Sequence, residues 1–322
     1  MSDDSQKPDQ RPESPPEEPE EGQPLPLMPL STRLALYYIL IFLVILFGGS
    51  LVLAFFGNEE LWKKISEGEG LDIGLILTIE ACLLLPIVAT TLGFIRFVDR
   101  KLPFEIGATW PPGEVERAPR DLAGAMLTAL VVLGFWRGLA GMVATFEPVM
   151  AGDDPQNANL SRVALFAIGF LAASCLEAWI LHGYIYSALR EQLSWVHAGG
   201  VSALLFVLPQ AASPEVPAAG LVNAFLIAML LAAMRELTGS FWPGVLFHGT
   251  WNTLTGSFFG LPVSGLEVPR IQTFKITGSE VWTGGEFGPE GSWLLSALVI
   301  LALIRLAARL TEDVEVDEVD EF

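Results

Sequence analysis

Residues 242–252, with the sequence WPGVLFHGTWN, combine an apolar helical stretch with two polar side chains. His248 and Asn252 stand four residues apart, so both project from the same face of a helix. Polar groups left unpaired at membrane depth are costly, which indicates that the pair has a purpose. The pair either holds neighbouring helices together or belongs to a functional site, and this stretch alone favours neither interpretation.

The rest of the chain has the composition of a membrane protein. Of its 322 residues, 52% are hydrophobic and 17% are charged, and several apolar runs are long enough to cross a bilayer. We predict an all-α fold, a polytopic transmembrane helical bundle of about eight spans with disordered acidic tails. The spans are expected near residues 34–57, 71–95, 119–144, 161–189, 196–212, 217–236, 241–259 and 292–309. In the outer loop 260–291 a short hairpin is expected around residues 270–282.

The net charge of −19 is concentrated at the two ends of the chain. Residues 1–30 hold eight acids and two bases, and residues 311–322 hold seven acids and no base. We predict a disordered, acidic, proline-rich tail at 1–32, a transmembrane domain at 33–310 and an acidic tail at 311–322. Solvation is the expected role of the tails, with docking of a basic partner as the alternative. The sequence contains no basic patch that would indicate a nucleic-acid partner.

The distribution of Lys and Arg predicts the orientation in the membrane. With the N-terminus inside, twelve basic residues fall on the inner side and five on the outer side. The acidic N-terminus does not resemble a signal peptide, so the first span is expected to stay as an anchor. We expect an integral protein of the bacterial cytoplasmic membrane with both termini in the cytoplasm.

Further polar side chains lie within the predicted spans, where an ionisable group is a functional candidate. Glu177 lies in the middle of the fourth span, and His182 follows about 140° further round a straight helix. Gln210 lies in the fifth span beside a proline that is expected to kink the helix. Glu80 and Arg137, in the second and third spans, are interpreted as a structural ion pair.

These groups supply the parts that a hydrolytic reaction needs. A carboxylate such as Glu177 can act as a general base on water. His and Asn side chains can donate hydrogen bonds to a developing oxyanion. A transporter could use the same carboxylate and histidine as a proton relay, so the inventory alone leaves both functions open.

The order and spacing of three motifs resemble the CAAX prenyl endopeptidase and bacteriocin-processing (CPBP) family of intramembrane proteases. That family carries Glu-Glu-x-x-x-Arg on one helix, Phe-x-x-x-His on the next and His-x-x-x-Asn two helices later. The third motif is intact here as His248 and Asn252, preceded by Trp-Pro-Gly. The resemblance covers residues 85–310. It implies that Glu177 acts on the attacking water, while His248 and Asn252 stabilise the oxyanion.

The first two motifs depart from the family pattern. The second Glu is replaced by Ala178 and the Arg by His182. In the second motif Phe206 is kept, but the His is replaced by Gln210. Gln210 can hydrogen-bond a water but cannot accept its proton near neutral pH. Loss of one member of a cooperating site can lower the rate by orders of magnitude.

The resemblance therefore predicts an intramembrane endopeptidase that hydrolyses a peptide bond of a membrane-associated substrate, with full or impaired activity. The alternative is a non-catalytic CPBP-like protein that binds or scaffolds a membrane partner, and a transporter is a third interpretation. The partner is expected to be a membrane-embedded or lipid-modified peptide or protein. The site is expected in a polar cavity between the fourth, fifth and seventh spans that opens toward the cytoplasm.

No cofactor is expected. Catalytic zinc takes three protein ligands of N, S or O type. Only Glu177 and His248 stand in matching positions, which makes them weak metal candidates.

Overall fold

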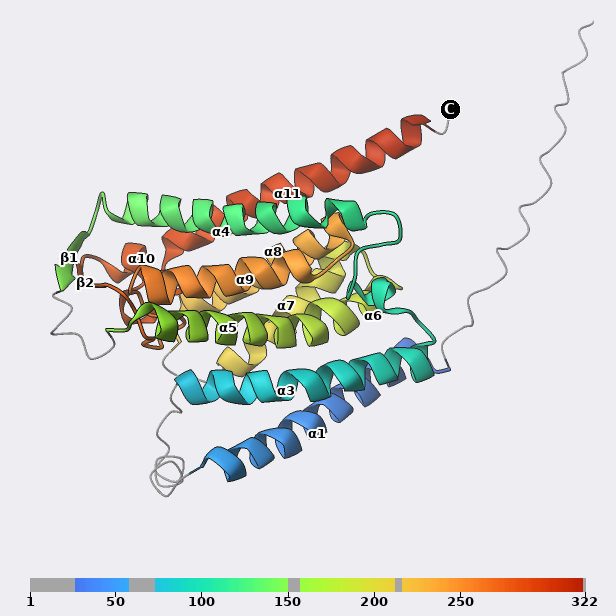
Figure 1. Ribbon diagram of the computed structural model, residues 1–322. Coiled ribbons are helices and arrows are strands. Elements are labelled where there is room, and N and C mark those ends of the chain that lie inside the picture. Colours follow the sequence, from blue (N-terminus) through green and yellow to red (C-terminus); the bar gives the residue numbers. More distant parts are fainter. Residues whose placement is uncertain (1–26, 58–72, 150–156, 212–215, 321–322) are drawn as a thin grey trace, which may run out of the picture.

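The computed structural model describes residues 27–57, 73–149, 157–211 and 216–320. Figure 1 shows long helices that run side by side as one bundle. In chain order the main helical segments are α1 (Leu30–Phe56), α3 (Ile73–Phe94) with the π-helical η1 (Ile95–Asp99), α4 (Ala118–Ala140), α5 (Leu160–Glu177) with the π-helical η5 (Ala178–Ile185), α6 (Tyr186–Arg190), α7 (Trp195–Ala211), α8 (Ala218–Thr238), α9 (Trp242–Asn252) with the π-helical η6 (Thr253–Phe258), and α11 (Trp293–Asp320).

Short elements complete the connections between these helices. They are the 3-10 helices η2 (Pro103–Ile106), η3 (Val115–Arg117), η7 (Gly285–Phe287) and η8 (Pro289–Gly291), the single-turn α10 (Glu280–Thr283), and the strands β1 (Thr145–Val149) and β2 (Thr273–Thr277).

The predicted all-α bundle is confirmed. Among the described residues, six helical segments are long and apolar enough to cross a membrane: Leu30–Phe56, Ile73–Asp99, Val115–Ala140, Leu160–Arg190, Ala218–Thr238 and Trp293–Thr311. The two other predicted spans are also helical, as the shorter apolar α7 and as α9 with η6. All eight predicted spans are therefore helices.

The last helix is longer than its predicted span. The sequence placed the end of that span near residue 309, whereas α11 runs to Asp320. Hydropathy predicts where a helix leaves the membrane and not where the helix itself ends. Residues 311–320 contain neither Gly nor Pro, the residues that commonly end a helix. Residues 1–26, which include most of the predicted N-terminal tail, lie outside the described residues.

The central helix of the bundle is α8, which packs against α7, α9 and α11. Its buried side chains include several alanines, among them Ala228, Ala232 and Ala233. Small side chains let helix backbones approach closely where the hydrophobic effect between helices is weak. Gly199 lets α7 pack closely against α8, because a Cβ added there would lie 3.1 Å from the Cβ of Ala232. The peripheral α1, by contrast, leaves most of its apolar side chains exposed.

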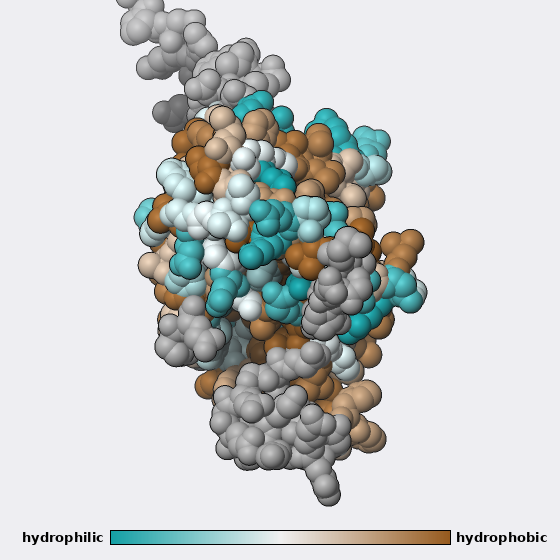
Figure 2. Space-filling view, turned by 90° about the vertical axis from the view of Figure 1, so that its left-hand side faces the viewer, coloured by the Kyte–Doolittle hydropathy of each residue, from teal (hydrophilic) through white to brown (hydrophobic). Residues whose placement is uncertain are grey.

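The two strands form an antiparallel ribbon at one end of the bundle. Thr145 pairs with Thr277 and Val149 with Thr273, so the strand in the 260–291 segment pairs with a distant part of the chain. The predicted local hairpin is therefore wrong, although a strand does lie within its range. Hydrophilic side chains gather over this end, which Figure 2 shows face on.

The predicted ion pair between Glu80 and Arg137 does not form. Arg137 lies near the end of α4, where its guanidinium stacks 3.6 Å from the ring centroid of Phe146 on β1. A cation over an aromatic face is stabilised by the ring quadrupole. The ribbon therefore supplies the partner of Arg137, and Glu80 lies elsewhere in the bundle.

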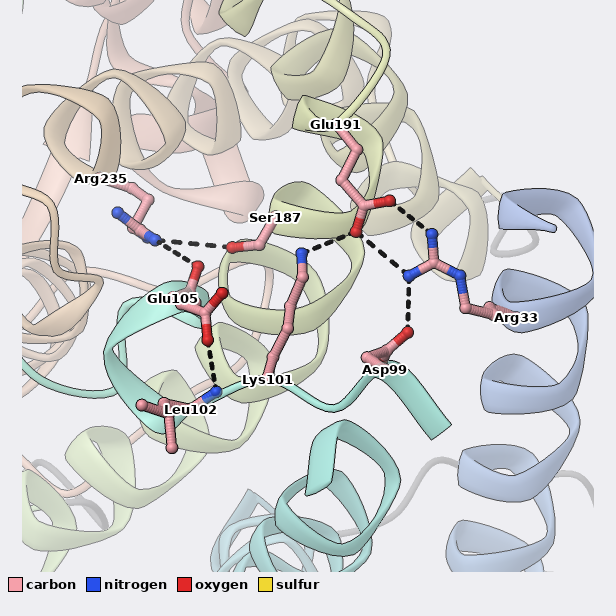
Figure 3. Close-up of polar contacts among 8 residues, drawn as sticks. All are labelled: Arg33, Asp99, Lys101, Leu102, Glu105, Ser187, Glu191 and Arg235. Atoms are coloured by element: carbon pink, nitrogen blue, oxygen red, sulfur yellow. Dashed lines mark hydrogen bonds and ion pairs between the residues drawn. The ribbon is translucent and has the colours of Figure 1, made fainter. Parts of the chain in front are cut away.

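A polar network fixes the opposite end of the bundle (Figure 3). The guanidinium of Arg33 on α1 donates to Asp99 at 2.6 Å and also to Glu191, which directly follows α6. The ammonium of Lys101 donates to the same Glu191 carboxylate at 2.6 Å. The network ties the start of α1 to the end of η1, which continues α3, and to the end of α6.

Candidate active site

The centre of the candidate site is a contact between α5 and α9. Nδ1 of His248 lies 3.2 Å from Oε2 of Glu177, with both side chains partly buried. Glu177 is the last residue of α5, and His248 lies in the middle of α9. The expected neighbourhood of these two side chains is therefore confirmed.

A glycine explains why the two helices approach closely enough for this contact. Gly249 directly follows His248, and a Cβ added there would lie 2.5 Å from Cδ2 and 3.3 Å from Cα of Leu171 on α5. An added Cβ would displace the side chain of Leu171 and press on its Cα, so glycine permits this close approach. The sequence Phe-His-Gly thus places a functional side chain next to the residue that permits the helix contact.

The helix that carries Glu177 changes its hydrogen bonding directly after this residue. The segment η5 is π-helical, with hydrogen bonds from residue i to i+5, whereas the sequence analysis assumed a straight α-helix. Residues five apart then lie roughly one turn above each other, which brings His182 back toward the face of Glu177. His182 is buried, and neither ring nitrogen has a hydrogen-bond partner among the described residues. It lies within electrostatic range of His248.

Asn252 ends α9 four residues after His248, so the two share a helix face as predicted. Its side chain is buried, and Oδ1 has no hydrogen-bond partner in the described part of the chain. The same holds for the hydroxyls of Ser174 on α5 and Thr255 on η6. Buried polar groups are normally hydrogen-bonded, so unpaired atoms on these neighbouring elements are typical of a site that receives water or substrate.

The second motif meets the third at a small cavity. The ring of Phe206 on α7 lies edge-on to the imidazole of His248, with 6.1 Å between centroids. Gln210, one turn further along α7, lines a cavity of about 20 Å³ together with His248, Ser264 and Glu290. A cavity of at least roughly 10–15 Å³ with several polar neighbours can hold one water molecule.

Glu290 is a site residue that the sequence analysis missed. It lies on η8, is 7% exposed, and accepts hydrogen bonds from the indole N–H of Trp251 at 2.8 Å and from the hydroxyl of Ser264. It lines the same small cavity as His248. The sequence placed Glu290 in a glycine-rich loop outside the membrane, and no motif identifies it.

Glu80 is the second missed residue. It lies on α3, within electrostatic range of both Glu177 and His248. Its position in the middle of a predicted span was a signal for function. Glu80 was interpreted instead as the partner of Arg137 in a structural ion pair.

The position of the cavity differs from the prediction. It is lined by α7, α8, α9 and the segment after η6, and α5 does not line it. The lining residues Ser264 and Glu290 belong to the connection 260–291, which lies at the end of the bundle away from the Arg33 network. In the predicted orientation the connection 260–291 lies outside the cell. A cavity at this end of the bundle would then not open toward the cytoplasm. The opening toward the cytoplasm and the orientation in the membrane both stay predictions.

Metal ligands do not converge within the described residues. No three His, Cys, Asp or Glu side chains come together there in a way that could hold a metal ion. Glu80 and Glu290 interact with His248 through space and do not join Glu177 in a ligand set.

The motif-bearing segment matches a known family. Residues 159–254 match the model of the family described as type II CAAX prenyl endopeptidase Rce1-like, which confirms the predicted resemblance. This segment runs from the start of α5 into η6 and contains Glu177, Gln210, His248 and Asn252, whereas Glu80 and Glu290 lie outside it. No curated protein matches the chain significantly. The apolar helices indicate an integral membrane protein, and its segment 159–254 is similar to the Rce1-like family.

Proposed function

With residues 159–254 matching the Rce1-like family, we propose that this chain is an intramembrane endopeptidase that cleaves a membrane-embedded or lipid-modified peptide. The observation that carries the proposal is the 3.2 Å contact between His248 and Glu177, beside a cavity of one water's size that His248 also lines. A base within reach of a confined water is the minimum arrangement for hydrolysis without a nucleophilic side chain.

In the proposed reaction the water oxygen attacks the scissile carbonyl carbon. One water proton passes to the Glu177–His248 pair, and a tetrahedral oxyanion forms. The carbon–nitrogen bond then breaks, and the pair returns the proton to the leaving amine, so that an acid and an amine are released. The pair therefore holds the proton from the attack of water until the leaving amine accepts it.

Asn252 supports the oxyanion in this proposal. It shares a helix face with His248 and is buried, so its amide N–H groups can donate to a negative oxygen in a place where water competes little. Donors of this kind are worth about 10²–10³ in rate when they are aimed at the developing charge.

Gln210 limits the proposed activity. It lines the water cavity, so it can orient the water through a hydrogen bond, but its amide cannot take a proton. Glu290 lines the same cavity and provides a carboxylate that the family motif does not contain. We therefore expect slow but real cleavage, with Glu290 supporting the water in place of the lost motif histidine.

The proposal includes no metal ion. Glu177 and His248 would give two ligands, and catalytic zinc takes three protein ligands. No third His, Cys, Asp or Glu joins them in the described part of the chain. A chelator should leave cleavage unchanged, and activity that is lost on chelation and restored by zinc would favour the zinc alternative.

A second candidate is a non-catalytic protein that binds a membrane partner. Two observations favour it, the replacement of the motif carboxylate by the buried Ala178 and of the motif histidine by Gln210. Such a protein would keep the polar side chains around His248 to bind a peptide without hydrolysing it.

The test uses the full chain in lipid nanodiscs with a library of membrane-tethered peptides, and mass spectrometry detects the products. Wild type should yield discrete fragments, whereas Glu177→Gln should yield none and Glu147→Gln, on the exposed ribbon, should match wild type. Peptide that is retained uncut by both wild type and Glu177→Gln would favour the binding protein.

A further inference from the structure

A second cavity, separate from the candidate active site, lies where α4 begins and α8 ends. Its volume is about 590 Å³, and α4, α8, α9 and α11 line it. This size falls within the range of about 300–1,000 Å³ that small-ligand sites occupy. None of the predicted catalytic side chains lines it.

The cavity lining holds more basic than acidic side chains, although the chain as a whole carries a net charge of −19. Arg117, Arg120 and Arg309 line it from two helical segments that are far apart in the sequence. The only acid in the lining is Asp121, whose carboxylate accepts a hydrogen bond from the indole of Trp110 at 3.0 Å. The excess positive charge is therefore local to this cavity.

The guanidinium groups have capacity for a further anion. Arg117 donates through Nη1 to Glu114 at 2.7 Å, but its Nε is buried without a hydrogen-bond partner among the described residues. Arg120 and Arg309 are exposed and form no ion pair within the described chain. Guanidinium groups bind phosphate oxygens in a forked geometry, with charge-assisted hydrogen bonds.

The rest of the lining is mainly apolar. Leu306 lies one turn before Arg309 on α11, and apolar side chains of α8 and α9 continue this wall. Arg120 and Arg309 stand at the ends of the predicted spans 119–144 and 292–309, where a helix meets the headgroup region. Arginine side chains at the headgroup level next to apolar side chains match a phospholipid, which has a phosphate and acyl chains, better than a free anion.

The part of the cavity lined by α4 has free space at a glycine. A Cβ added at Gly124 of α4 would meet no atom within 4 Å. Because Gly124 also lines the cavity, a larger side chain at this position is expected to fill part of it.

From these observations we propose that the cavity binds the phosphate of an anionic phospholipid headgroup. The arginines hold the phosphate, and the apolar wall receives the beginning of an acyl chain. The site is independent of peptide cleavage, so its test does not rely on the proposed function.

The test measures binding to the purified full chain in detergent by native mass spectrometry, with phosphatidylglycerol, phosphatidylcholine and inorganic phosphate as separate probes. Phosphatidylglycerol should bind more tightly than phosphatidylcholine, and phosphate alone should bind weakly. The double variant Arg120→Gln/Arg309→Gln should weaken phosphatidylglycerol binding at least roughly tenfold, the loss expected for one charge-assisted hydrogen bond. Gly124→Phe should block it.

Arg305→Gln is the matched control, because Arg305 is exposed on the same helix one turn from Arg309 and does not line the cavity. It should bind phosphatidylglycerol like wild type. Equal losses in the control and the double variant, or equal binding of both lipids, would overturn the proposal. Tight binding of inorganic phosphate alone would identify a site for a free anion and would overturn the assignment to a lipid.

Discussion

The imidazole of His248 and the carboxylate of Glu177 approach within 3.2 Å because Gly249 lets α9 lie directly against Leu171 of α5. The two polar side chains are 71 positions apart in the chain, and their contact depends on a missing side chain. The chemistry of the site and the packing of the bundle are therefore linked at one helix crossing.

The glycine at this crossing can be tested directly. Gly249→Ala should lower the free energy of unfolding by about 1–3 kcal/mol, because the added Cβ overpacks a close contact. Cleavage should fall as well, since α5 and α9 must separate. Gly138→Ala on α4 is the control, because a Cβ there meets no atom within 4 Å, and it should be neutral or stabilising. Equal stability of the two variants in thermal unfolding would contradict the role of Gly249.

Restoring the motif histidine should increase cleavage. Gln210→His places a group that can accept a proton at the water cavity, and general base catalysis typically contributes about 10²–10⁴-fold. The gain should disappear when Glu177→Gln is added. Adding Ala178→Glu with His182→Arg would extend the repair, because a new buried carboxylate needs a nearby cation to stay ionised. If the well-folded Gln210→His variant cleaves no faster than wild type, Gln210 is not the limiting residue.

Glu290 should show separate structural and catalytic roles. Glu290→Ala leaves the buried indole N–H of Trp251 without its acceptor, so the free energy of unfolding should fall by about 1–3 kcal/mol. Glu290→Gln keeps an oxygen acceptor and should preserve most of the stability, while cleavage falls because the carboxylate at the water cavity is lost. Thermal unfolding and cleavage assays on both variants separate the two effects. Unchanged cleavage in Glu290→Gln would show that this carboxylate does not act on the water.

The Arg33 network should make stability depend on pH. Burial opposes ionisation of Glu191, but the hydrogen bonds from Arg33 and Lys101 outweigh it and hold the pKa of Glu191 below its usual value. A lowered pKa in the folded state stabilises the fold above the unfolded pKa, about 4.3 for Glu. This stabilisation is lost as the pH falls through the lower, folded-state value.

Glu191→Gln should therefore melt at a lower temperature than wild type at neutral pH, and the difference should shrink on acidification toward about pH 3. Glu116→Gln, at an exposed position of η3, should follow the wild-type profile. A constant difference between Glu191→Gln and wild type across this range would exclude titration of Glu191 as the cause.

The orientation predicted from basic residues can be tested with reporter fusions. Reporters placed after residue 322 and within residues 265–285 should lie on opposite sides of the membrane, because α11 connects the two regions. The predicted orientation places the end of the chain in the cytoplasm. Two reporters on the same side would contradict the assignment of α11 as a span.

Hydropathy alone determined the helical bundle and its eight segments, because burial in a bilayer requires long apolar helices whatever their neighbours are. The motifs also identified Glu177, His248 and Asn252, because residue spacing along a helix is a local property. The π-helical turn after Glu177, the partner of Arg137 and the pairing of β1 with β2 depend on contacts between distant segments. Only the tertiary structure placed Glu290 in the same small cavity as His248, since no sequence period connects η8 with α9.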